Sequence, residues 1–177
     1  MNQTGPRPLS IGLDYFRYVV FEDPQWDFHT LDFDRDIARA EKLDHDRIDA
    51  LNPDLRPFFA RGGKLIQYHG WSDPQIAPGN SVDYYQSVVE RLGNVDNSYR
   101  LFMVPGMAHC GGGEGATSFN AMPALERWVE RKQAPDRIVA SGTRDGRNVT
   151  HPLCPYPKVA VYKGTGSTND AGNYVCR

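Results

Sequence analysis

Two residues with acid–base side chains follow apolar runs of the kind that form buried strands. Asp73 comes after the run in KLIQYHGWSDP, and His109 comes after the run in YRLFMVPGMAH. A carboxylate that orients an imidazole, with the imidazole as general base, activates a serine hydroxyl for acyl transfer. In one group of such triads the serine comes first, on a Gly-x-Ser-x-Gly turn, and the acid precedes the histidine. This sequence has no Gly-x-Ser-x-Gly, so it supplies acid and base without an evident nucleophile.

The apolar pattern around these residues predicts alternating strands and helices. Strands are expected over 64–70 and 99–106, and helices over 81–93 and 120–135. The apolar faces of the two helices would comprise Val82, Tyr85, Val89 and Leu92 in the first, and Leu125, Trp128 and Val129 in the second. Nearly continuous apolar strands are typical of a parallel sheet covered on both faces. The order predicts a doubly wound α/β fold with Asp73 and His109 at the carboxyl ends of its strands, where functional groups gather.

The region before the first strand carries weaker signals. Residues 1–31 show no period of 2 or 3.6 and are expected to be irregular. A helix is predicted from about residue 33, with Asp34 as its N-cap. Its buried face would comprise Ile37, Ala40 and Leu43. A short helix is expected next, with Asn52 as N-cap, Pro53 at its first position and Gly62 after its end.

Composition narrows the classes of function. A chain of 177 residues with 40% hydrophobic side chains can bury the core of one domain. With a formal net charge of −2 and scattered Lys and Arg, it lacks the basic stripe that nucleic acids require. No run approaches the roughly 18 apolar residues of a membrane span, and MNQTGPRPLS lacks the apolar segment of a signal peptide. We expect no nucleic-acid or membrane partner, and any export signal would lie upstream.

The chain has three cysteines, an odd number, so they cannot all pair with one another. Cys154 and Cys176 flank a segment rich in Gly, Asn and Ser, where a disulfide would stabilise the fold by about 3 kcal/mol. The alternative is two buried free thiols. Cys110, next to His109, is left without a partner.

Four blocks of the sequence together resemble the C-terminal region of the tannase and feruloyl esterase family, which includes mono(hydroxyethyl) terephthalate hydrolases. These blocks are GGKLIQYHGWSDPQIAPG, RLFMVPGMAHCGGG, ERWVERKQAPDRIVAS and PLCPYPKVAVYKGTGSTNDAGNYVC. The similarity runs from about Trp26 to Cys176. It implies a serine carboxylic-ester hydrolase for aromatic esters such as hydroxycinnamates or gallates, with an α/β-hydrolase core and an inserted lid.

Carried over residue by residue, the resemblance makes Asp73 the triad acid and His109 the base. It makes Cys110 one half of a disulfide whose partner, just before the nucleophilic serine, is missing. The serine, the oxyanion hole, most of the lid and the lid calcium site have no counterpart in this sequence. The partner implied is therefore the missing N-terminal half of the fold, and the chain alone is expected to be inactive.

The resemblance also sets the expected domain organisation. Residues 1–31 would be a remnant of the lid domain, and residues 32–177 the C-terminal part of an α/β-hydrolase catalytic domain. This part would hold an incomplete parallel sheet with flanking helices. No metal or other cofactor is expected in this chain. A secreted or periplasmic location is expected, which disulfides would fit.

Several other features have simpler interpretations. His69 is assigned to packing or to a hydrogen bond near the strand end. Asp32, Asp34 and Asp36 have EF-hand spacing, but Gly and Glu are absent where the loop needs them, so a helix start explains them better. GGGEGA from Gly111 matches a dinucleotide motif only formally, and is better explained as a tight turn beside the histidine.

Two other functional hypotheses stay open. The chain could be a non-catalytic truncated remnant, a half-fold that binds a partner through its exposed sheet edge. It could also be one chain of a two-chain enzyme that its N-terminal half completes.

Overall fold

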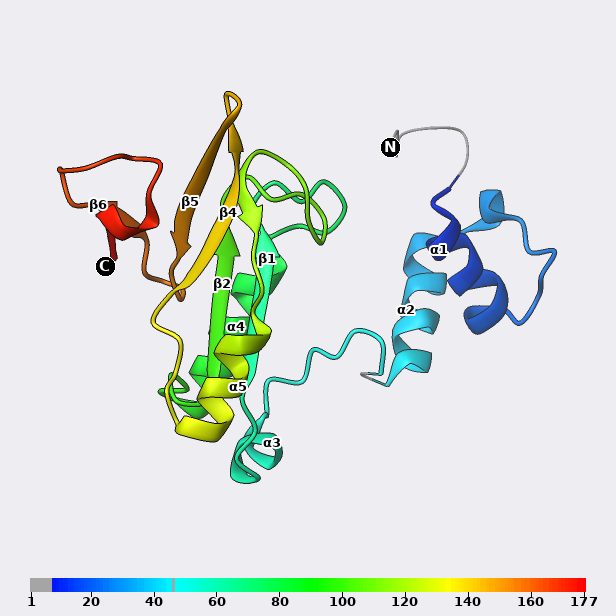
Figure 1. Cartoon of the computed structure of the whole chain (residues 1–177). Helices are drawn as coiled ribbons and strands as arrows, with labels where there is room; N and C mark the ends of the chain where they lie inside the picture. The colour runs from blue at the N-terminus through cyan, green and yellow to red at the C-terminus, as the bar shows by residue number, and fades with distance from the viewer. Residues whose placement is uncertain (1–7, 46) are drawn as a thin grey trace. The chain divides into compact units, whose positions relative to one another are not determined.

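The computed structural model describes residues 8–45 and 47–177, in two compact units that divide between Asn52 and Pro53 (Figure 1). This division lies beyond residue 31, where the lid remnant was predicted to end. The assignment of residues 1–31 to a lid stays a prediction. None of the helices in the described ranges is long and apolar enough to cross a membrane.

The first unit is largely helical, which corrects the expectation of irregular structure over residues 8–31; residues 1–7 lie outside the described residues. Helix α1 (Ser10–Asp14) runs into a π-helix (Tyr15–Val20), and a 3-10 turn (Phe28–Thr30) precedes helix α2 (Phe33–Asp44). Stacked rings of Phe16, Phe21 and Trp26 hold this region together. An α-helix of five residues, a π-helix of six and a 3-10 turn of three are too short to leave a clear 3.6-residue period in the sequence.

Helix α2 begins at Phe33, two residues earlier than the predicted cap at Asp34 implies. The N-cap is Asp32, not Asp34, because the Asp32 carboxylate accepts hydrogen bonds from the backbone N–H groups of Asp34 and Arg35. The predicted apolar face is right for Ala40 and wrong for Ile37 and Leu43. Ala40 is buried together with the acids Asp36 and Asp44, whereas Ile37 and Leu43 are exposed. The three acids at residues 32–36 therefore begin a helix, as interpreted, and form no EF-hand loop.

The second unit carries the predicted strands and helices and several unpredicted strands. Its helices are α3 (Arg56–Ala60), α4 (Gly79–Leu92) and α5 (Met122–Arg131), with a 3-10 turn at Ala171–Asn173. Its strands are β1 (Leu65–Gly70), β2 (Tyr99–Val104), β3 (Gly115–Ser118), β4 (Ile138–Arg144), β5 (Arg147–Leu153), β6 (Ala160–Tyr162) and β7 (Tyr174–Cys176).

The sheet of β1 and β2 is parallel, as predicted, and packs against a separate core on each face. The register pairs Leu65 with Tyr99 and Gly70 with Val104. One core joins the strands to α4 and includes Tyr85, Val88, Tyr99, Leu101 and Met103. The other core joins them to α5, β4 and β5 and includes Phe102, Val104, Ala124, Ile138, Ala140 and Leu153. Helices and strands on both faces explain why β2 is apolar apart from Arg100 near its start.

Three details of the second unit differ from the sequence-based expectation. Helix α3 starts at Arg56, and neither Asn52 nor Pro53 caps it, although Gly62 follows its end with a positive φ of 81°. On α5, Trp128 is buried but Val129 is exposed. Strand β1 is less buried than β2, since Tyr68 is 46% exposed. Within the described residues, β1 pairs with β2 alone, so its other edge is free.

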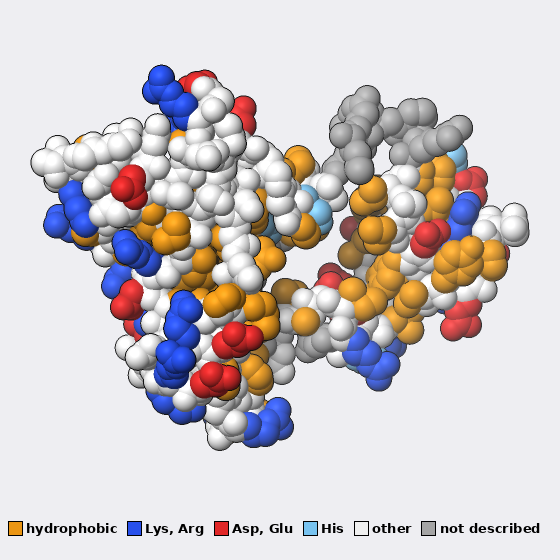
Figure 2. Space-filling view, in the orientation of Figure 1, with side chains coloured by type: hydrophobic (Ala, Val, Ile, Leu, Met, Phe, Trp, Pro, Cys, Tyr) orange, Lys and Arg blue, Asp and Glu red, His pale blue; other side chains and the backbone are white. Residues whose placement is uncertain are grey.

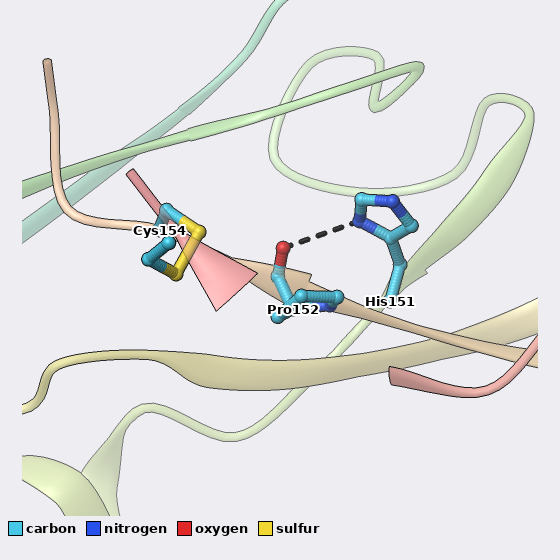
Figure 3. Close-up of a disulfide and its surroundings, with 4 residues drawn as sticks. His151, Pro152 and Cys154 are labelled. Carbon is cyan, nitrogen blue, oxygen red and sulfur yellow. Dashed lines mark hydrogen bonds between the residues drawn. A yellow bond between two sulfur atoms is a disulfide. The ribbon is translucent and has the colours of Figure 1, made fainter. Parts of the chain in front are cut away.

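The antiparallel strands at the C-terminal end were not predicted. Strands β3, β4 and β5 form one sheet, and β6 and β7 form another. The β4–β5 turn consists of Asp145 and Gly146, both with positive φ, which is the geometry that Asp-Gly favours in hairpins. A disulfide joins Cys154 to Cys176 with their Cα atoms 5.5 Å apart, beside His151, whose Nδ1 donates to the Pro152 carbonyl (Figure 3).

Candidate active site

The parallel register brings the loops after β1 and β2 to the same edge of the sheet. Gly70 and Val104, the last residues of the two strands, are partners in the register. Asp73 lies three residues beyond one strand end, and His109 five beyond the other. The two predicted site residues are thus brought together by the strands that the sequence indicated.

Gly70 allows the two loops to touch. A Cβ atom at this position would lie 2.1 Å from the carbonyl oxygen of Met107, closer than any side chain tolerates. The same Met107 oxygen accepts a hydrogen bond from the backbone N–H of Ser72 at 3.0 Å. The backbone before Asp73 is therefore bonded directly to the backbone before His109.

A tight turn rich in glycine holds the histidine loop. The N–H of Glu114 donates to the Gly106 carbonyl at 3.0 Å. Gly113 has a φ of 87°, and a Cβ there would lie 2.0 Å from the same carbonyl oxygen. Only glycine fits such a crossing. The interpretation of GGGEGA as a turn beside His109 is confirmed.

The acid and the base are in direct contact. His109 donates from Nδ1 to Oδ2 of Asp73 at 2.8 Å. The Asp73 side chain is only 3% exposed, whereas that of His109 is 38% exposed. Nε2 of His109 makes no hydrogen bond to the described residues. The ring also borders a cavity of about 170 Å³ together with Tyr68, Ile76 and Met107. The imidazole is thus oriented by a buried carboxylate and open on its other side, as a general base must be.

Four hydrogen bonds fix the Asp73 carboxylate in its ionised form. Oδ1 accepts from the backbone N–H groups of Gln75 at 2.8 Å and Ile76 at 3.1 Å. Oδ2 accepts from His69 Nε2 at 3.0 Å as well as from His109. Burial raises the pKa of Asp73, but these hydrogen bonds outweigh it and hold the pKa well below its usual range.

Of the residues around Asp73, His69 has the surroundings that were hardest to predict from the sequence. A hydrogen bond near the strand end was the expected role, and the bond to Asp73 confirms it. Its second partner, the Ser81 hydroxyl at 2.7 Å from Nδ1, was not predicted. The alternation of side-chain directions along β1 could have indicated such a partner. It places Gln67 and His69, two polar residues, on one face of an otherwise apolar strand.

Cys110 is a free, exposed cysteine in the described structure and borders the same cavity as His109. Its φ of 59° is unusual for a residue with a side chain and belongs to the same tight turn. Among the described residues, no group of three or more His, Cys, Asp or Glu side chains is arranged to hold a metal ion.

A comparison with known sequences identifies the family. The sequence profile of "Tannase and feruloyl esterase" matches residues 12–177. The chain belongs to the tannase and feruloyl esterase family. It is 45% identical over 131 residues to mono(2-hydroxyethyl) terephthalate hydrolase of Piscinibacter sakaiensis, covering 72% of this chain and 22% of that protein. It is 36% identical over 192 residues to feruloyl esterase C of Talaromyces stipitatus, covering 96% of this chain and 36% of that one.

Solved structures agree with this membership of the tannase and feruloyl esterase family. The crystal structure of feruloyl esterase B from Aspergillus oryzae matches with a TM-score of 0.84 at 32% identity, over 97% of this chain and 38% of that chain. The fold is therefore part of an α/β-hydrolase-like fold, as predicted. The chain spans about a third of the length of these feruloyl esterases.

Proposed function

We propose that this chain is the C-terminal segment of a serine carboxylic-ester hydrolase in which Asp73 and His109 serve a serine outside these residues. The observation that carries the proposal is the Nδ1 bond from His109 to a buried carboxylate, with Nε2 left open. A histidine bonded in this way keeps its acceptor nitrogen available for a hydroxyl proton.

The proposed reaction uses side chains and water. Nε2 of His109 takes the proton of the serine hydroxyl as the oxygen attacks the ester carbonyl. Asp73 stabilises the imidazolium, which then protonates the leaving alcohol. Water attacks the acyl-enzyme in a second round of the same steps. No cofactor in this chain takes part in the proposed reaction.

The missing N-terminal half of the fold would complete the site along the free edge of β1. Tyr68 on β1 is exposed, and so are Ile76 and Met122, each of which borders a cavity together with Tyr68. Figure 2 shows hydrophobic side chains at the surface of this unit. An unpaired strand edge beside apolar surface is where further strands of a sheet add. The exposed Cys110 would form a disulfide with a cysteine beside the nucleophile, and its free thiol supports this part of the proposal.

The substrate class proposed is an aromatic carboxylic ester of the hydroxycinnamate or gallate type. The relatives in the comparison are named for feruloyl and terephthalate esters, both of which have aromatic acyl groups. A secreted or periplasmic location is proposed as well. The disulfide between Cys154 and Cys176 supports it, because such bonds persist in oxidising compartments.

The test uses the complete protein, meaning this chain expressed with the sequence encoded directly upstream of it. His109→Ala should abolish most hydrolysis of methyl ferulate, methyl gallate and p-nitrophenyl acetate. His29→Ala is the matched control, since His29 is exposed and contacts Asp27 alone among charged groups. Normal turnover by His109→Ala would refute the proposal. A folded complete protein that hydrolyses none of these esters would favour the non-catalytic, partner-binding alternative.

A further inference from the structure

A continuous chain of hydrogen-bonded side chains leads from the core of the second unit to the Asp73 carboxylate. The Tyr99 hydroxyl contacts Oε1 of Gln67, and Nε2 of Gln67 lies 3.0 Å from Oγ of Ser81. Ser81 Oγ lies 2.7 Å from Nδ1 of His69, and Nε2 of His69 lies 3.0 Å from Oδ2 of Asp73. Three elements contribute to this chain, because Tyr99 is on β2, Gln67 and His69 are on β1, and Ser81 is on α4.

The ionised carboxylate sets the direction of the bond from His69, and a neutral His69 sets the direction of the others. Asp73 can only accept, so Nε2 of His69 carries a proton and donates it. A neutral His69 then accepts at Nδ1, and the Ser81 hydroxyl donates to it. Ser81 in turn accepts from the Gln67 amide nitrogen, which leaves the Gln67 oxygen to accept from the Tyr99 hydroxyl. Each polar group is satisfied by this one arrangement.

Burial supports the same arrangement. Tyr99 is fully buried, Ser81 is 9% exposed, and the His69 side chain is 12% exposed. Burial, with smaller contributions from Tyr84 and Tyr85, raises the pKa of Tyr99, so its hydroxyl keeps the proton that it donates. Within the described residues, no buried side-chain nitrogen or oxygen lacks a partner. A proton added to Nδ1 of His69 would turn the Ser81 hydroxyl proton away and leave that proton without its acceptor in this network.

We propose that His69 is a positioning residue for the triad acid, held by Ser81 as the neutral tautomer with its proton on Nε2. The inference rests on the proposed function, in which Asp73 is that acid. The backbone of Gln75 and Ile76 fixes one carboxylate oxygen, and His69 fixes the other, so the carboxylate cannot rotate away from His109.

Neutrality of His69 matters as much as its position. A charged His69 would form an ion pair with Asp73 at the same oxygen that faces His109. The negative charge that stabilises the catalytic imidazolium would then be compensated before the reaction began. The neutral tautomer orients the carboxylate and leaves its charge available to the base.

The kinetic test compares two replacements of His69 in the complete protein, with turnover counted per active site. His69→Gln keeps one donor and one acceptor at the end of the side chain, whereas His69→Leu keeps bulk alone. His69→Leu should lower kcat about 10- to 100-fold, the range expected for one lost hydrogen bond to a charged group, with KM unchanged. His69→Gln should restore kcat to within a few-fold of wild type. Equal kcat values in wild type and His69→Leu would overturn the inference, as would a His69→Gln variant no better than His69→Leu.

The spectroscopic test does not depend on ester hydrolysis. Nitrogen-15 labelling of histidines should show His69 with an unprotonated Nδ1 and a protonated Nε2 at neutral pH. Ser81→Ala should change these resonances, and Ser87→Ala should not. Ser87 is the matched control, because it is exposed on the same helix and bonds only to the Asp83 backbone.

The two tests separate the inference from the proposed function. An active wild-type esterase whose His69 is doubly protonated, or protonated on Nδ1, would overturn the inference alone. A wild-type protein that hydrolyses no ester would overturn the proposed function, and with it the role of His69, whatever the resonances show.

Discussion

Replacing Asp73 with Asn probes the proposed triad with almost no change in shape. The structure indicates how the amide would sit. The backbone N–H groups of Gln75 and Ile76 require an oxygen at the Oδ1 position. The amide oxygen therefore remains there, and the NH₂ group replaces the oxygen that faces His69 and His109. An NH₂ group donates, so His109 must accept at Nδ1 and carry its proton on Nε2.

This tautomer is the wrong one for catalysis. Nε2 of His109 is the atom that must take the serine proton, and in Asp73→Asn it already has one. The same tautomer error in a serine protease triad costs about 10⁴-fold in kcat. We therefore expect kcat for methyl ferulate to fall by about 10⁴-fold in the complete protein, with KM changed little.

The assay needs a control for the loss of one negative charge. Asp83→Asn provides it, because Asp83 is exposed on α4 and lies outside the hydrogen-bond chain of Asp73. Asp83→Asn should keep wild-type kcat. A fall of less than about 10-fold in a folded Asp73→Asn protein would refute the assignment of Asp73 as the triad acid.

Three further predictions concern the chain itself. Thiol counting under denaturing, non-reducing conditions should find one free thiol per chain, at Cys110, and three thiols would contradict the disulfide seen in the structure. Gly70→Ala should destabilise by about 1–3 kcal/mol in urea unfolding, since its Cβ meets a backbone oxygen, whereas Gly79→Ala, with open space around it, should not. Because hydrogen bonds lower the pKa of Asp73 below the unfolded value of about 3.9, their contribution is full above pH 4 and lost as pH falls through the folded pKa. Asp73→Asn should therefore flatten the decline of unfolding free energy below pH 4, and an unchanged decline would contradict this reasoning.

The strands and helices that position the site could be predicted because tertiary packing and local pattern agree there. Apolar runs with few interruptions predicted β1 and β2, and a 3.6-residue period predicted α4 and α5. The contact of Asp73 with His109 followed from parallel strands that end at one edge. The apolar pattern failed to predict burial where the packing partners of a side chain are distant in the sequence. Val129 looks apolar on the helix but is exposed, and Tyr68 is exposed on a strand that lacks a second neighbour among the described residues.

The remaining elements depend on signals that hydrophobic periodicity does not carry. The β4–β5 hairpin was marked by Asp145 and Gly146, a turn dipeptide rather than an apolar run. The cap at Asp32 depended on which of three neighbouring acids reached the free N–H groups, and that choice is made by side-chain geometry. The contact between His69 and Ser81 joins a strand to a helix, so only the folded chain brings these two residues together.

The most direct test of the central claim is to locate the nucleophile. The complete protein would be treated with a serine-reactive fluorophosphonate, digested, and mapped by mass spectrometry, alongside His109→Ala. We expect one labelled serine, outside these 177 residues, and no labelling in His109→Ala, because the base must take the hydroxyl proton. A label on a serine within this chain, with Ser72 beside Asp73 the first to check, or labelling that survives the loss of His109, would contradict the account.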